Sequence, residues 1–196
     1  MTTTLLLAQA CNNRWSNHRL LAACALLPVT ALRAPQPAAF FGSLWALLGH
    51  LLDVDRFYLD ALHDQPRPYQ DTAWPDLATL RAAQSASDLR LIALCRSLGP
   101  QQLTPLITLP RASGPVREQR LRTLQHLFVH QLHHRGQAHA LLLASGVAPP
   151  QLDEFFLAQD EPLRRAELAA LGIDEGELGG LARSSNCLYR GHAGAP

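Results

Sequence analysis

The stretch GSLWALLGHLLDVDRFYLDAL, residues 42–62, decides the fold class, because its large apolar residues recur every three or four positions. Ser43 is a residue type that caps helix N-termini, so a helix is predicted to begin there. His50 and Asp55 fall outside the narrow polar arc of this helix. Both are expected to have partners, because an unpartnered polar group is costly on an apolar face. The apolar stripe contains Leu44, Leu47, Leu48, Leu51, Tyr58, Leu59 and Leu62.

Three further long helices are predicted, one before this stretch in the sequence and two after it. Leu and Ala are abundant and β-branched residues are few, which favours helix over strand. Pro28 ends the first of these helices and Gly146 follows the last, because proline disfavours helical geometry before it and glycine suits a left-handed closing position. Four amphipathic helices predict an all-α fold, a four-helix bundle in which sites form between facing helices. The three further helices run from about Thr4 to Leu26, from Asp76 to about Gly99, and from about Val116 to Ser145.

The remaining segments are expected to be loops and short elements. Three prolines between residues 105 and 115 exclude a continuous helix, although a short extended piece fits Leu106 to Leu109. A short helix is predicted to open near Asp160 and to be closed by Gly172. We therefore expect one domain over residues 1–172 and a flexible tail over residues 173–196, which are rich in Gly and Ser.

Composition excludes several classes of function. The 196 residues, 47% of them apolar, are enough for one core, and the formal charge of +1 with no strong basic cluster disfavours nucleic-acid binding. Neither a secretory signal nor a bilayer-spanning apolar stretch is present, so a cytoplasmic protein without membrane contact is expected. The four cysteines form no CxxC pair, which predicts reduced thiols rather than a zinc knuckle or redox motif.

The stretch HLFVHQLHHRGQ, residues 126–137, contains four of the nine histidines. His126, His130 and His134 are four residues apart, so they lie along one side of a helix, whereas His133 falls on a neighbouring face. Two histidines at this spacing can reach a single ion, as in the HExxH zinc helix. No Glu follows the first histidine of the pair, which argues against the protease chemistry of that motif.

These histidines predict a metal site with three protein ligands. His130 and His134 would be joined by His50, the other histidine that the helix pattern places in an apolar context. His126 is expected to line the site or to support a ligand rather than to ligate. The alternative is a structural cluster, in which the histidines line a polar core and the purified protein holds no metal. His133 and His139 are interpreted as surface or interface residues.

Several segments together resemble the DinB family, in particular its proteobacterial branch. They are HHRGQAHALLLASG at 133–146, GSLWALLGHLLDVDRFYLDAL at 42–62 and RWSNHRLL at 14–21, followed by LASGVAPPQLD at 143–153. The resemblance implies an up-down-down-up bundle, commonly a homodimer, that binds a divalent metal. Nickel or zinc is the expected ion, with iron or manganese as further candidates. The resemblance assigns the ligands to His50, His130 and His134.

The resemblance also suggests roles around the metal. Asn17 would orient a ligand or close a helix contact, and Trp15 is expected to pack in the core. Asp55 would accept a hydrogen bond from a ligating histidine, or pair with Arg135 in a buried bridge. Gly136 costs about 1 kcal/mol inside a helix, so another helix is expected to approach closely there. Val129 stands where relatives often have Asn.

Three histidine ligands leave coordination positions open, as in catalytic rather than structural sites. By resemblance, the expected reaction is metal-assisted transfer of a low-molecular-weight thiol to an electrophilic small-molecule substrate. Metal-dependent hydrolysis is a second enzymatic hypothesis, and a non-catalytic metal-binding protein of the stress response is a third. The substrate would be selected by loops 27–42 and 99–115, which carry no motif.

Overall fold

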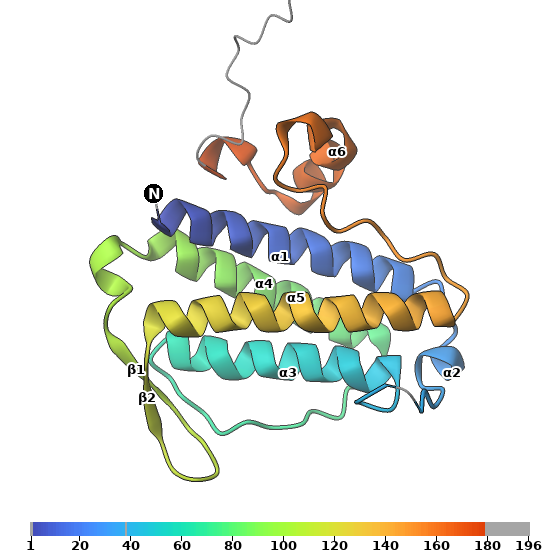
Figure 1. The fold of residues 1–196 in the computed structure, drawn as a ribbon, viewed down its shortest axis with the longest axis horizontal. Coiled ribbons are helices and arrows are strands. Elements are labelled where there is room, and N and C mark those ends of the chain that lie inside the picture. Colours follow the sequence, from blue (N-terminus) through green and yellow to red (C-terminus); the bar gives the residue numbers. More distant parts are fainter. Residues whose placement is uncertain (1, 38, 179–196) are drawn as a thin grey trace, which may run out of the picture.

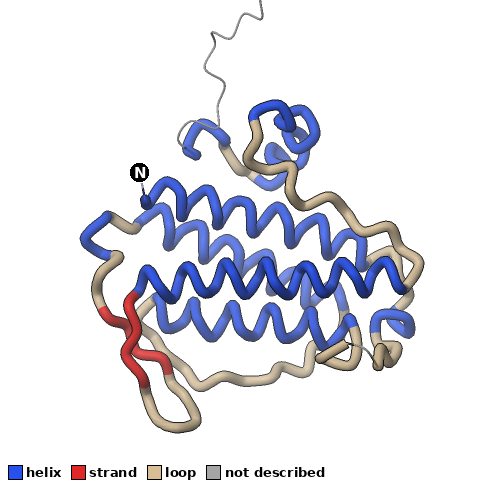
Figure 2. Tube along the Cα trace, in the orientation of Figure 1, coloured by secondary structure: helices blue, strands red, loops and turns tan. Residues whose placement is uncertain are grey.

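The computed structural model describes residues 2–37 and 39–178, and this part of the chain is mostly helical (Figures 1 and 2). Its α-helices are α1 (Thr2–Cys24), α2 (Val29–Leu32), α3 (Leu44–Leu62), α4 (Leu77–Ser97), α5 (Arg120–Ala144) and α6 (Glu161–Leu171). Short 3₁₀ helices lie at Pro100–Gln102, Ala158–Asp160 and Glu175–Leu178. No helix in the described residues is long and apolar enough to cross a membrane.

The four long helices α1, α3, α4 and α5 lie side by side (Figure 1). Helix α1 packs against α4 and α5, and α3 packs against the same two helices. The predicted starts of α3 and α4 are confirmed by their caps: Ser43 Oγ accepts the backbone N–H of Ala46 at 3.1 Å, and Asp76 Oδ1 that of Thr79 at 2.7 Å. The apolar stripe of residues 42–62 thus forms a helix that faces the core.

A small β-hairpin corrects the prediction for the segment before α5. Strand β1 (Leu106–Leu109), the predicted extended piece, pairs antiparallel with β2 (Val116–Gln119), so α5 begins at Arg120 rather than at Val116. Alternate β1 residues, Ile107 and Leu109, are buried against the helices, and this burial stabilises the hairpin. The purely helical expectation missed this pairing.

The chain after α5 passes along the outside of α1 and forms α6 there (Figure 1). Gly172 closes α6 in the left-handed region with φ 65°, as predicted. Packing extends beyond the predicted domain end at residue 172, because Ile173 and Leu178 are buried in the core. Residues 179–196, the rest of the predicted tail, lie outside the described residues.

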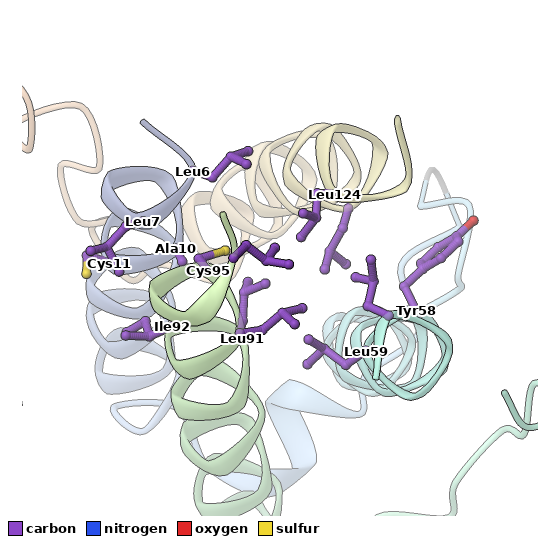
Figure 3. Close-up of a cluster of buried hydrophobic side chains, with 14 of the residues drawn as sticks. Leu6, Leu7, Ala10, Cys11, Tyr58, Leu59, Leu91, Ile92, Cys95 and Leu124 are labelled. Atoms are coloured by element: carbon purple, nitrogen blue, oxygen red, sulfur yellow. The ribbon is translucent and has the colours of Figure 1, made fainter. Parts of the chain in front are cut away.

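The apolar interior consists of two clusters. One surrounds Leu6, Leu59, Leu91 and Leu124, with Tyr58 at its edge (Figure 3). The other includes Leu20, Leu44, Leu52, Leu80 and Leu142. Buried polar side chains occupy positions between the two clusters along the four long helices. We call this set the polar layer: Asn13 and Asn17 of α1, Asp55 of α3, Gln84 and Asp88 of α4, and Gln131 and Arg135 of α5.

Candidate metal centre

Three histidines from two helices meet where α3 packs against α5. Helix α3 supplies His50, and α5 supplies His130 and His134, which are four residues apart and therefore about one turn apart. One ligand nitrogen from each ring lies within 4.8 Å of the other two. The structure therefore brings together the three side chains that the sequence indicated.

The separation between the rings of His50 and His130 is that of groups that share an ion. The Nε2 atoms of His50 and His130 are 3.2 Å apart. Two nitrogens in tetrahedral coordination, each about 2.0–2.1 Å from zinc, would be about 3.3 Å apart. His134 Nδ1 lies 2.7 Å from the amide oxygen of Gln137, so this nitrogen carries the proton and Nε2 keeps its lone pair. The donor set fits a divalent metal.

All three imidazoles are held in the form that binds metals. Burial lowers the pKa of His50 and of His134 below the ordinary histidine value. Burial, together with repulsion from the neighbouring histidines, lowers the pKa of His130 to about 3. At neutral pH the three rings are uncharged, so ligation displaces no proton. His130 Nδ1 is also buried without a hydrogen-bond partner among the described residues, so no contact to this nitrogen dictates which of the two ring nitrogens carries the proton.

Two aromatic side chains from loops complete the surroundings of His50. The ring of Phe41 stacks on the imidazole of His50 with centroids 4.3 Å apart, and it meets His134 edge-on at 5.3 Å. The hydroxyl of Tyr69 donates to Asp71 Oδ1 at 2.7 Å and lies 3.5 Å from His50 Nδ1, at the outer limit of a hydrogen bond. Sequence reasoning missed both residues, because loop segments carry no periodic signal.

The other histidines of α5 are not part of this group. His126 is exposed, its ring is 6.3 Å from that of His130 and 5.2 Å from that of Tyr58, and it borders a cavity of about 270 Å³. A lining role for His126 stays a prediction. His133 is exposed beside Gln137, and His139 Nε2 contacts the carbonyl oxygen of Pro150 at 2.9 Å.

Asp55 and Asn17, which were predicted to support the ligands, have partners outside the histidine cluster. Asp55 accepts a hydrogen bond from Gln84 Nε2 at 2.9 Å, rather than from a ligating histidine. Asn17 donates to Asp88 Oδ1 at 2.9 Å and accepts from Arg135 Nη1 at 3.2 Å, so its role is the helix contact and not the orientation of a ligand. Three residues predicted to support the ligands therefore belong to the polar layer: Asp55, Asn17 and Arg135.

Arg135 joins α5 to α1 through the polar layer. Its Nη1 also donates to the amide oxygens of Asn13 and Gln131, and Gln131 Nε2 donates to the Leu51 carbonyl at 3.5 Å, next to His50. Burial lowers the pKa of Arg135 to about 10 and raises that of Asp55 to about 6. Among the described residues, no side chain of the layer forms a hydrogen bond or ion pair with a histidine of the cluster, so its influence on the metal centre runs through the placement of α5.

Two expectations outside the cluster have different outcomes. Trp15 is fully buried, packs on Phe155 with centroids 5.7 Å apart and donates to Glu167 Oε2 at 2.7 Å, so the prediction of core packing is confirmed. The expected close helix approach at Gly136 is wrong within this chain, because a Cβ added there would meet nothing within 4 Å. Val129 is 65% exposed and lines no part of the histidine cluster.

The DinB family model matches residues 1–166. The chain belongs to the DinB family. The matched region includes all four long helices and therefore His50, His130 and His134. No curated protein matches the chain significantly. Membership of the proteobacterial branch of the DinB family stays a prediction.

Proposed function

We propose that this DinB family protein holds a divalent metal through His50, His130 and His134 and transfers a low-molecular-weight thiol to an electrophilic substrate. The observation that carries the proposal is the convergence of three neutral imidazoles from two helices. Three such ligands leave positions open for a substrate atom. Nickel and zinc are the proposed ions, since imidazole nitrogen suits both.

A bound divalent ion would stabilise a coordinated thiol as its thiolate, which is the attacking form. The residues of the chain would supply the rest. The three imidazoles hold the ion, Tyr69 restrains the ring of His50, and Phe41 covers one face of that ring from water. The reaction joins the thiol sulfur to the electrophilic carbon, and the thiol proton passes to the leaving group or to solvent.

The cysteines of the chain support an external thiol as the cosubstrate. Cys11, Cys24 and Cys95 are buried, and burial raises their pKa values to about 11, 12 and 12. A thiol with so high a pKa is not ionised at neutral pH and is a poor nucleophile. Cys187 lies outside the described residues. Among the described cysteines none can serve as an attacking group.

Elemental analysis of untagged protein, followed by turnover assays, tests the proposal. Wild type should hold about one divalent ion per chain, and His50→Ala and His134→Ala should lose it. His63→Ala is the matched control, because His63 is exposed at the end of α3, outside the cluster. The metal-loaded wild type should consume a low-molecular-weight thiol with an electrophile.

Other results of these assays would replace the proposal. Absence of metal even after reconstitution would overturn it and leave a structural histidine cluster. Cleavage of esters or amides without thiol would assign metal-dependent hydrolysis. Bound metal without turnover across a broad panel of thiols and electrophiles would favour a non-catalytic metal-binding protein of the stress response.

The same family membership leads us to propose an up-down-down-up bundle that forms a homodimer. The course of the chain in Figure 1 supports the bundle, because α1 and α5 run in one direction and α3 and α4 in the other. The outer side of α5 supports the dimer, since Val129, Leu132 and Leu143 are each about two-thirds exposed and Gly136 leaves open space beside them. Light scattering during gel filtration should give the mass of two chains, whereas a monomer would refute the pairing.

A further inference from the structure

A cavity lined largely by polar side chains lies between α1 and α4, apart from the candidate metal centre between α3 and α5. Its volume is about 240 Å³, and Leu171 at the end of α6 borders it. None of the three clustered histidines lines it. Its polar lining consists mainly of Arg14, Asn17 and His18 from α1, and Arg81, Gln84 and Asp88 from α4.

The two arginines of this cavity have no acceptor within the described part of the chain. Neither Arg14 nor Arg81 has a hydrogen bond or an ion pair there, and Arg14 Nε is buried from water without a partner. Other arginines of α4 are paired: Arg90 with Asp60 at 2.9 Å, and Arg96 with Glu177 at 2.8 Å. A buried donor without an acceptor is costly, so Arg14 Nε indicates a missing acceptor, and the charge of Arg81 at the same cavity favours an anionic one.

The wall of the cavity also offers an unused acceptor. Asp88 is 3% exposed, and its Oδ1 accepts the amide N–H groups of Asn13 at 3.2 Å, Asn17 at 2.9 Å and Gln84 at 3.2 Å. Its second oxygen, Oδ2, has no hydrogen-bond partner among the described residues, although Asp88 lines the cavity. The site therefore combines two free cationic donors with a free carboxyl oxygen.

We propose that this cavity binds a small organic acid that carries a hydroxyl group next to its carboxylate. The carboxylate would accept from Arg14 and Arg81, and the hydroxyl, which can donate or accept, would share a hydrogen bond with Asp88 Oδ2. A simple anion would leave Asp88 unsatisfied, and a neutral molecule would leave both guanidinium groups unsatisfied. The volume is below the range of about 300–1,000 Å³ that holds drug-sized ligands, so the ligand is a small metabolite.

Nuclear magnetic resonance on the metal-free full chain tests this assignment directly. The Nε–Hε signals of Arg14 and Arg81 are followed while lactate, propionate or lactamide is added at constant ionic strength. Lactate should shift both signals to saturation. Propionate lacks the hydroxyl and should bind more weakly, and lactamide lacks the charge and should leave the signals in place. The protein is metal-free in this experiment, so a carboxylate bound to an ion at the histidine cluster cannot cause the shifts.

Substitutions distinguish specific binding in the cavity from a nonspecific effect of added anions on the arginine signals. Arg14→Gln and Arg81→Gln should each weaken lactate binding by about tenfold or more, because each removes a charge-assisted hydrogen bond. Neither arginine has a hydrogen-bond or ion-pair partner in the part of the chain that the structure describes, so both variants should keep the wild-type backbone amide spectrum. Asp88→Asn should reduce the preference for lactate over propionate. Arg96→Gln, whose arginine is on the same helix but does not line the cavity, is the control and should bind as wild type.

Two results would overturn the proposal. One is a shift that grows linearly with ligand concentration and is the same in Arg14→Gln as in Arg96→Gln. The other is equal affinity for lactate and propionate in wild type, which would remove the reason to assign a hydroxy acid.

Discussion

On α5, residues of the histidine cluster and of the polar layer occupy neighbouring positions, yet their chemistry is opposite. His130 and His134 face α3, and Gln131 and Arg135, each one residue later, point into the interior. Arg135 donates to three amide oxygens of the chain, whereas His130 has a buried ring nitrogen, Nδ1, without a partner among the residues that the structure describes. Polar groups that satisfy one another hold a fold together, and convergent lone pairs without donors are available for an ion.

The polar layer also determines where the histidines stand. Gln131 Nε2 lies 3.5 Å from the carbonyl oxygen of Leu51, at the outer limit of a hydrogen bond, and so contributes to the contact of α5 with α3 beside His50. Arg135 fixes the same helix against α1 through Asn13 and Asn17. The metal centre therefore depends on the layer for geometry, whereas the layer needs nothing from the metal. Substitutions in the two regions should separate stability from metal binding.

The largest effect is expected from Arg135→Met in the polar layer. Removing the guanidinium leaves the carboxyl groups of Asp55 and Asp88 buried without their cation and the amide oxygens of Asn13 and Asn17 without a donor. Breaking a buried charge network in this way costs about 3–5 kcal/mol of the free energy of unfolding. Urea unfolding of metal-free protein measures it.

Arg122→Met, at an exposed position of the same helix, is the matched control for Arg135→Met and should change the free energy of unfolding by less than about 0.5 kcal/mol. If Arg135→Met were as stable as this control, the layer would not hold α5 in place.

His134→Ala should have the converse effect. In metal-free protein its free energy of unfolding should fall little, because the one hydrogen bond of His134 within the described residues is to Gln137 of its own helix. Added metal at 100 times its dissociation constant should stabilise wild type by about 2.7 kcal/mol and the variant hardly at all. Urea unfolding with and without metal measures both the stability of the metal-free proteins and the stabilisation that metal adds. Equal stabilisation of both proteins by metal would place the ion elsewhere.

The carboxyl of Asp88 should make stability depend on pH. Burial, and repulsion from Asp55, raise its pKa from 3.8 to about 7, so between these values the folded chain holds a proton that the unfolded chain has released. The stabilising contribution is complete below pH 3.8 and is lost as the pH rises through 7. In Asp88→Asn the decline between these pH values should be shallower, which urea unfolding across the range will show. An unchanged slope would mean that Asp88 is ionised in the folded state throughout.

Local patterns in the sequence were enough for the helices and for the three clustered histidines. The stripe along residues 42–62 and the caps at Ser43 and Asp76 depend only on neighbours within one or two turns, and so does the spacing of His130 and His134. His50 followed because a histidine inside an apolar stripe needs a partner. Family resemblance then led to the same three residues.

Features that depend on contacts between residues far apart in the sequence could not be predicted from local patterns. The pairing of Val116–Gln119 with β1 depends on a turn and on burial against the helices, and Val116–Gln119 alone reads as the start of α5. The partners of Asp55 and Asn17 depend on the rotation of four helices about their axes, which a one-dimensional pattern leaves open. Tyr69 lies in a loop, and its place beside His50 follows from the path of residues 63–76 across α3.

The smallest expected effect belongs to Tyr69, the residue that links the histidine cluster to a carboxylate. Its hydroxyl lies between His50 Nδ1 and Asp71, and such partners restrain the ring of a ligating histidine. Tyr69→Phe should weaken metal binding by about tenfold, at the low end for such contacts because the separation is 3.5 Å. Competition with a chromophoric chelator measures the affinity. Asp71→Asn keeps an acceptor for the Tyr69 hydroxyl and should change the affinity less, whereas unchanged affinity in Tyr69→Phe would show that α3 and Phe41 alone orient His50.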